Sequence, residues 1–329
     1  MDRAGTALHV AHFPQEQRLS TPWWYKETEI SEPSFRLPRA FAAYLRDPLV
    51  QRPAGSEGKR GECRLAFAVE QGKTRLRHSF VTHPFHLTRP WYLDPALPGL
   101  AVVYVQTPAG GLIQGDRASL CFILAPEAQV HVTSQAAEKI HTMIANCALQ
   151  QISFALGPGA YAEYYPEPII LFPGARFGQE LKVELSEGAS FFFAEIFLSR
   201  CSTDGASFEA VATSLNVQDA RGILLLQERS FVLPTQQNLA GPGILGPHSV
   251  WGQAFLIGPA VPAAWAQEIH MLLSTEPDVV CGATVLPWGR GIGVKAVGSD
   301  IRKVRRVLQT AWHALRIRHL GIAAFSLPK

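Results

Sequence analysis

The segment from Ala101 to Leu124 reads A-V-V-Y-V-Q-T-P-A-G-G-L-I-Q-G-D-R-A-S-L-C-F-I-L. Two apolar runs, Ala101 to Val105 and Ala118 to Leu124, enclose the loop Thr107–Asp116, which holds three glycines and one proline. Glycine adopts positive φ angles that other residues avoid, so this loop is expected to follow a path closed to bulkier residues. The segment therefore predicts two strands joined by a long, sharply folded connection.

The rest of the chain supplies further strand patterns, several of them separated by Gly/Pro turns. Short strands at this spacing favour stacked or wound antiparallel sheets over βαβ units and predict a mainly β protein. One helical interruption is expected near residues 135–145. The strands expected from the pattern are Arg64 to Glu70, Ala128 to Thr133, Leu149 to Leu156, Glu180 to Leu185, Ser190 to Leu198 and Ile223 to Leu233.

Near the C-terminus the apolar residues recur at helical spacing. A short helix is expected from Pro262 to Ser274 and the longest helix from Ser299 to Leu320, with Gly321 as its stop. The polar face of the longer helix is basic and carries Arg302, Lys303, Arg305, Arg306, Arg316 and Arg318. We interpret this face as solvated, or alternatively as a docking surface for an acidic partner.

Composition restricts the class of protein. With 47% hydrophobic and 17% charged residues the chain is globular, and a net charge of +3 gives no reason to expect a nucleic-acid partner. The five scattered cysteines form no C-x-x-C pair and are expected to be reduced thiols. The first residues show no secretory signal, and prolines interrupt the apolar region Ala240 to Trp265. We expect a soluble cytoplasmic protein without a membrane partner.

Residues 1–60 differ from the remainder of the chain. They contain several prolines, and they run into a polar stretch from Gln51 to Glu62 that is typical of a linker. We therefore expect an N-terminal extension of unknown role over residues 1–60 and one domain over residues 61–329. A short helix is expected from Arg39 to Arg46.

No signature of catalysis stands out. The chain lacks a P-loop, an H-E-x-x-H motif and a G-x-S-x-G motif, so we expect no enzymatic activity. Glu195 interrupts the apolar run F-F-F-A-E-I-F-L, where an unpaired carboxylate is costly to bury. The simpler interpretation of Glu195 is that it forms an ion pair with Arg176 or Arg200. The functional interpretation is that its carboxylate lines a polar passage.

Two more carboxylates, Glu163 and Glu167, lie in the aromatic and proline-rich stretch Y-A-E-Y-Y-P-E-P. As a general acid and base they would suit a β-solenoid hydrolase, but a spacing of four in a strand or loop fixes no useful separation.

Five segments occur in a characteristic order: R-P-W-Y at Arg89 to Tyr92, P-A-G-G-L-I-Q-G-D at Pro108 to Asp116, V-T-S-Q-A-A-E-K-I at Val132 to Ile140, the stretch Leu156 to Phe177, and F-A-E-I-F-L-S-R at Phe193 to Arg200. Taken together, they resemble the urease accessory protein D family, called H in some organisms. Three departures stand out: Ala136 occupies a usual glycine position, Glu138 precedes the retained Lys139, and Glu167-Pro168 stands where many members have Gln followed by Asp or Glu.

The resemblance implies a mostly β, helix-like winding of strands and a non-enzymatic scaffold. Members join urease accessory proteins F and G, the latter a GTPase, and the urease apoprotein, and are thought to offer Ni²⁺ a polar internal passage. For this chain it implies transient Ni²⁺, no tightly bound cofactor, and a metal relay through Glu163, Glu167 and Glu195, with Asp116 as a further contact. Residues expected to bind partners are Arg302, Arg305, Arg306, Lys139 and Arg176.

One physical feature of the sequence fits a conductor. Dense His/Cys clusters would hold Ni²⁺ too tightly to release it, whereas this chain offers scattered carboxylates. The alternative is a pure adaptor that docks through the Thr107–Asp116 loop and the basic helix.

Overall fold

The computed structural model describes residues 39–46, 58–199, 206–241, 243–258 and 260–328. The chain divides into two units, Met1–Glu32 and Pro33–Lys329, and all described residues belong to the second. The expected extension over residues 1–60 therefore lies largely outside the described residues, and its boundary stays a prediction. Arg200, one expected partner of Glu195, also lies outside them.

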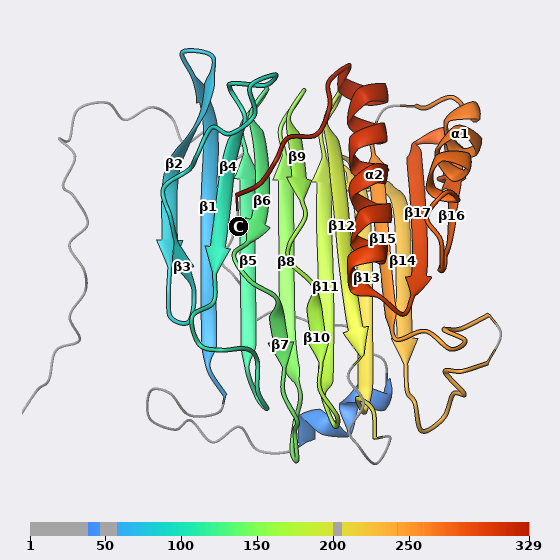
Figure 1. Cartoon of the computed structure of the whole chain (residues 1–329). Coiled ribbons are helices and arrows are strands. Elements are labelled where there is room, and N and C mark those ends of the chain that lie inside the picture. Colours follow the sequence, from blue (N-terminus) through green and yellow to red (C-terminus); the bar gives the residue numbers. More distant parts are fainter. Residues whose placement is uncertain (1–38, 47–57, 200–205, 242, 259, 329) are drawn as a thin grey trace, which may run out of the picture. The chain divides into compact units, whose positions relative to one another are not determined.

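Two β-sheets make up this unit, and they face each other across an apolar core (Figure 1). The first sheet has seven strands in the order β14-β13-β11-β8-β5-β1-β2. Its strands are β1 (Arg60–Glu70), β2 (Lys73–Val81), β5 (Arg117–Leu124), β8 (Ala148–Leu156), β11 (Arg176–Leu185), β13 (Ala210–Asp219) and β14 (Leu224–Val232).

The second sheet has ten strands, eight of them in the order β16-β17-β15-β12-β9-β6-β4-β3, with β10 pairing with β12 and β7. Its strands are β3 (His86–Leu87), β4 (Ala101–Gln106), β6 (Gln129–Ser134), β7 (Glu138–Ile140), β9 (Tyr161–Tyr164), β10 (Ile169–Leu171), β12 (Ser190–Ser199), β15 (Val250–Ile257), β16 (Val279–Val285) and β17 (Gly291–Gly298).

The chain winds between the sheets as a β-solenoid. From β4 to β13 its longer strands alternate between the second and first sheets, and each pairs in parallel with the strand one coil later. Paired residues such as Ala101 and Val130, or Tyr161 and Ser190, are 29 positions apart (130 − 101 and 190 − 161). The expected helix-like winding is confirmed. The antiparallel pairing expected from the strand pattern is wrong here, because the Gly/Pro turns mark corners between layers rather than hairpins.

Antiparallel pairing occurs only toward the ends of the described sheets. β2 closes one end of the first sheet against β1, and β14 closes the other end against β13. In the second sheet β15, β17 and β16 continue antiparallel from β12.

The corners between the first and second sheets repeat one backbone shape. Glu127, Gly159 and Gly188 take positive φ angles of 61°, 66° and 70° at equivalent positions. The N–H of Glu127 donates to the carbonyl of Pro158, and the N–H of Gly159 donates to that of Glu187, both at 2.9 Å. The hydrogen-bond ladder thus continues through the corners, and Gly159 of L-G-P-G-A supplies the positive φ angle at one of them.

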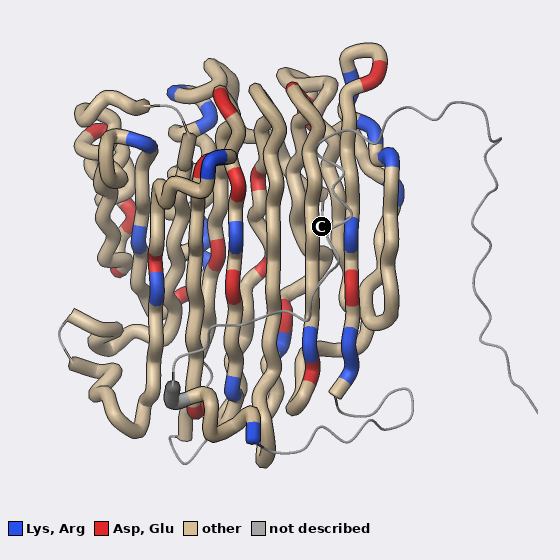
Figure 2. Tube along the Cα trace, turned by 180° about the vertical axis from the view of Figure 1, so that it is seen from behind, with Lys and Arg blue, Asp and Glu red and all other residues tan. Residues whose placement is uncertain are grey.

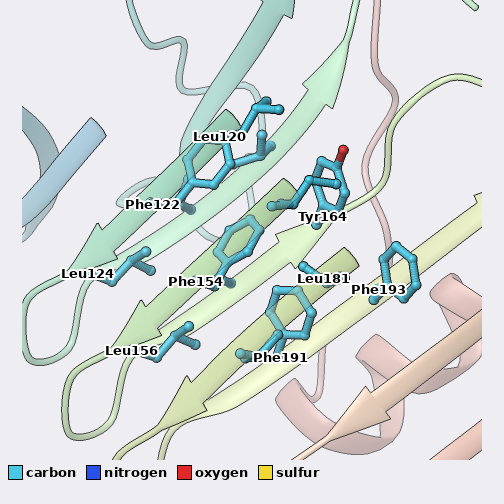
Figure 3. Packing of buried hydrophobic residues seen from close by; sticks show 14 of the residues in the cluster. Leu120, Phe122, Leu124, Phe154, Leu156, Tyr164, Leu181, Phe191 and Phe193 are labelled. Atoms are coloured by element: carbon cyan, nitrogen blue, oxygen red, sulfur yellow. The ribbon is translucent and has the colours of Figure 1, made fainter. Parts of the chain in front are cut away.

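Aromatic and aliphatic side chains fill the space between the sheets. Figure 3 shows Phe122 and Phe154 of the first sheet beside Phe191 and Phe193 of the second. The rings of Phe122 and Phe154 stack with centroids 4.5 Å apart. Burying such side chains is the dominant stabilising term of a fold of this kind.

Two helices, α1 (Ala264–Leu273) and α2 (Ile301–Leu320), cover the outer face of the second sheet (Figure 1). Both were expected. Asp300 caps α2 by accepting the N–H of Arg302, and Gly321 ends it with φ of 72°. No described helix is long and apolar enough to cross a membrane.

One sequence-based expectation of helix needs correction. Residues 135–145 form β7 and irregular segments instead, since Leu112 pairs with Ile140 and draws this segment into a short parallel contact. Residues 39–46 are helical as expected and form two 3₁₀ helices, η1 (Arg39–Ala42) and η2 (Tyr44–Arg46). Phe41 of η1 packs with Cys147 and Leu149 of the solenoid.

The Thr107–Asp116 loop connects β4 to β5 and needs its glycines. Gly111 has φ of 129°, and a Cβ there would lie 2.3 Å from the carbonyl oxygen of Lys139. That close approach allows the N–H of Leu112 to donate to the same oxygen at 2.8 Å. Gly110 has φ of 79° but open space around it.

Gly111→Ala is expected to lower the free energy of unfolding by clearly more than Gly110→Ala. Both add backbone strain of about 1 kcal/mol, but only the first also drives a methyl group into Lys139 and weakens its hydrogen bond. Urea denaturation of the two variants and the wild type measures the difference. Equal losses would show that the loop does not depend on this contact.

Candidate functional site

An interior pocket with several polar side chains in its lining lies between the two sheets. Its volume is about 40 Å³, enough for water, and it is lined by strands of both sheets. Three carboxylates line it, those of Glu138, Glu167 and Glu195, beside the amides of Gln150 and Gln179. The remaining lining is mainly apolar, so these oxygen atoms define the site.

Glu195 of β12 is buried and points toward the first sheet. Its carboxylate accepts hydrogen bonds of 2.6 Å from Gln179 of β11 and from Gln253 of β15. Burial raises the pKa of this carboxyl to about 7, although both amides act in the opposite direction. The expected ion pair with Arg176 is wrong, because Arg176 pairs with Glu209 at 2.8 Å.

Glu138 of β7 is a pocket residue that the sequence-based reasoning missed. The residue is half-buried, but its carboxyl group lies in the interior, and burial raises the pKa of that group to about 7. Thr107 hydrogen-bonds to it and lowers the pKa in part. The only sequence signal was its departure from the family pattern beside Lys139.

Glu167 stands at the edge of the interior pocket. It lies between Pro166 and Pro168, and its backbone N–H donates to Ser134 Oγ at 2.9 Å. Its Oε2 atom forms an ion pair of 2.5 Å with Arg305 of α2. Glu167 also lines a second, outer pocket of about 290 Å³ between α2 and the C-terminal residues.

Glu163 lies on the opposite face of the second sheet from Glu195. Glu163 is paired across the strands with Phe192, whose side chain packs under the helices. Glu195 lies two positions after Phe193, whose side chain faces the first sheet, so the two side chains point to that same side. The structure therefore does not bring Glu163 into the pocket with Glu195.

Glu163 belongs instead to a buried network under α2. Its carboxylate contacts His131 Nδ1 at 2.6 Å and accepts hydrogen bonds from Tyr161 at 2.5 Å and Trp312 Nε1 at 2.9 Å. Arg316 Nε lies 3.3 Å from it, and Arg316 also pairs with Asp94 at 2.5 Å. Burial would raise the pKa of Glu163, but His131 and Arg316 outweigh it and hold this pKa below its ordinary value.

Asp116 is buried and closes the Thr107–Asp116 loop. Its carboxylate accepts the backbone N–H of Lys59 at 2.8 Å and that of Ile113 at 3.0 Å. Lys59 Nζ lies 3.5 Å away. These bonds give Asp116 a structural role, and its part in metal contact stays a prediction.

The residues expected to bind partners are for the most part already in ion pairs within the chain. Lys139 is exposed beside the loop. Arg316, expected on the exposed face, is buried, because its guanidinium serves two buried carboxylates. The pairs are Arg302 with Asp300, Arg305 with Glu167, Arg306 with Glu276 and Arg176 with Glu209.

Charged residues of both signs are distributed along the strands on the side opposite the view of Figure 1. Figure 2 shows Lys and Arg interspersed with Asp and Glu along the strands seen from behind. Within the described ranges, no group of three or more His, Cys, Asp or Glu residues is arranged to hold a metal ion.

The fold and the pocket define the class of protein: a β-solenoid with a helix-covered face and a carboxylate-lined interior. The family model described as "UreD urease accessory protein" matches residues 59–328. The chain therefore belongs to the UreD family of urease accessory proteins.

Individual relatives agree with this assignment. A urease accessory protein UreD of Haloarcula marismortui is 32% identical over 287 residues, which is 87% of this chain and 95% of the relative. UreD of Natronomonas pharaonis is 31% identical, covering 87% and 96%. UreD of Photorhabdus laumondii is 30% identical, covering 85% and 89%.

Arg316→Met is expected to lower the free energy of unfolding by about 3–5 kcal/mol, because it leaves Glu163 and Asp94 buried without their cation. Arg302→Met removes an exposed arginine of the same helix and should change stability little. Thermal unfolding followed by circular dichroism compares the two. A small effect of Arg316→Met would contradict the role of Arg316 as their counter-ion.

Glu195→Gln is expected to stabilise the protein increasingly as pH rises. The folded pKa of about 7 exceeds the ordinary 4.5, so the folded state holds an extra proton between these values. The wild type therefore loses stability from about pH 4.5 to about 7, by on the order of 3 kcal/mol, and the glutamine does not. The measurement is urea denaturation at pH 5, 6, 7 and 8, with exposed Glu184→Gln as control. A difference that does not vary with pH would contradict the raised pKa.

Proposed function

We propose that this protein is a non-enzymatic urease maturation factor of the cytoplasm. It docks on the urease apoprotein together with accessory proteins F and G and helps to deliver Ni²⁺ to the urease active site. Membership in the UreD family supports the first part of the proposal. The observation that supports delivery is the interior pocket, because the carboxylates of Glu138, Glu167 and Glu195 all line it.

The chemistry of the pocket suits a cation in transit. Carboxylates bind Ni²⁺ less tightly than imidazole or thiolate clusters do, so they release it more readily. With pKa values near 7, Glu138 and Glu195 also exchange a proton for the metal at neutral pH, which weakens retention further. Ni²⁺ is here a cargo and not a resident cofactor.

The relay that we propose differs in part from the one expected from sequence. Glu167 and Glu195 remain in it, and Glu138 joins them. Glu163 and Asp116 are better explained by the network under α2 and by closure of the loop.

Glu195→Gln is expected to lower nickel occupancy of urease several-fold in cells grown at limiting nickel, while the complex still assembles. The amide keeps the size of the side chain but removes the negative charge that attracts Ni²⁺. Metal content of purified urease and co-purification of the accessory proteins are the measurements, with Glu184→Gln as the exposed control. Normal nickel occupancy of urease in cells that carry Glu195→Gln would contradict the delivery role.

The second candidate is a pure adaptor. It is favoured by Ile144, which is 86% exposed and whose N–H hydrogen-bonds to Gln114 of the Thr107–Asp116 loop. In this reading, the exposed Ile144 side chain beside the loop is a contact point for the partner. In this case Ile144→Asp abolishes co-purification, and Glu195→Gln leaves nickel occupancy unchanged.

A further inference from the structure

The interior and outer pockets meet at two residues. Pro166 and Glu167 line both of them, whereas Glu138 and Glu195 line only the interior pocket and Arg305 and Trp312 only the outer one. Glu167 is therefore the carboxylate that lines both pockets.

The backbone at Glu167 is fixed. Prolines on both sides restrict the φ and ψ angles of this stretch to extended values, because the ring sets its own φ and excludes helical conformations of the residue before it. The hydrogen bond from the Glu167 N–H to Ser134 Oγ adds a further restraint at 2.9 Å. The carboxylate is thus presented at one place, and it cannot move away by a backbone change.

The partner of this carboxylate is far less restricted. Arg305 reaches Glu167 from α2 through a long side chain that is 34% exposed, against 10% for that of Glu167. Its NH1 and NH2 atoms lie 3.5 and 2.5 Å from the two carboxylate oxygens. A guanidinium at this position occupies the oxygen atoms that a metal ion would use.

We propose that Arg305 is a gate to the interior pocket: its guanidinium holds Glu167 until a divalent cation displaces it. This inference rests on the proposed delivery of Ni²⁺, in which Arg305 would control entry of the ion into the interior pocket. The exchange is cation for cation, so Glu167 never lacks a counter-ion. Arg305 acts through Glu167 and is a positioning residue rather than a metal ligand.

The neighbouring Arg306 supplies a matched control. It lies on the same helix and loses the same charge on substitution, but it pairs with Glu276 at 3.0 Å and lines neither pocket. A non-specific effect of helix charge on Ni²⁺ binding would appear equally in Arg305→Gln and Arg306→Gln.

The test is titration calorimetry of the full chain with Ni²⁺ alone at pH 7. Arg305→Gln is expected to bind Ni²⁺ about tenfold more tightly than the wild type, whereas Arg306→Gln binds as the wild type does. Arg305→Lys restores a cation and should return the affinity toward that of the wild type. In the double variant Glu167→Gln/Arg305→Gln the gain should be lost.

Equal affinities of Arg305→Gln and Arg306→Gln, or no detectable binding by either, would overturn the gate. A gain in Ni²⁺ affinity that persists in Glu167→Gln/Arg305→Gln, which lacks the Glu167 carboxylate, would also overturn it. These outcomes are separable from failure of the delivery role, which Glu195→Gln tests in cells. Arg305→Gln could bind Ni²⁺ more tightly while Glu195→Gln cells still make urease with normal nickel occupancy. That combination would show that Arg305 competes with a cation at Glu167 but that the site takes no part in delivery.

Discussion

The second sheet is covered on both faces, and much else in the structure follows from this constraint. One face packs on the first sheet and the other under α1, α2 and the C-terminal residues. Strand β12 is accordingly buried at nine of its ten positions. Any polar side chain in such a strand must find partners within the protein, because water cannot supply them. The two buried glutamates of this sheet are both satisfied, but by opposite means.

Glu163 is compensated by charge and Glu195 by neutral amides. The first shares Arg316 with Asp94 and takes further hydrogen bonds from three ring side chains, so its ionised form is stabilised. The second has only Gln179 and Gln253, and its pKa rises to about 7. Two glutamates on neighbouring strands therefore have different chemistry: one fastens the long helix, and the other can lose or accept a proton at neutral pH.

Both α-helices and eight of the seventeen described strands were expected from local pattern, since alternation and helical spacing are properties of short windows. The other strands, among them β13, β15, β16 and β17, were not expected individually. The parallel winding was not expected from local pattern either, because partners 29 residues apart leave no local trace and the corners resemble hairpin turns. The same limit applied to the site. Glu195 and Glu167 were visible as charges in apolar or proline-rich surroundings. By contrast, the face that Glu163 occupies and the position of Glu138 depend on strand register. The partner of Arg305, Glu167, lies 138 positions away in the sequence.

The cover of the second sheet by its last elements has a consequence for synthesis. The coils pair with neighbours about 30 residues away, so they can assemble in order as the chain leaves the ribosome. Trp312, Arg316 and Phe325 are synthesised well after His131, Tyr161 and Glu163, and until then this face of the sheet lacks the contacts that they supply. A nascent chain of this protein thus presents a partly apolar sheet face that α2 and the segment after it cover later.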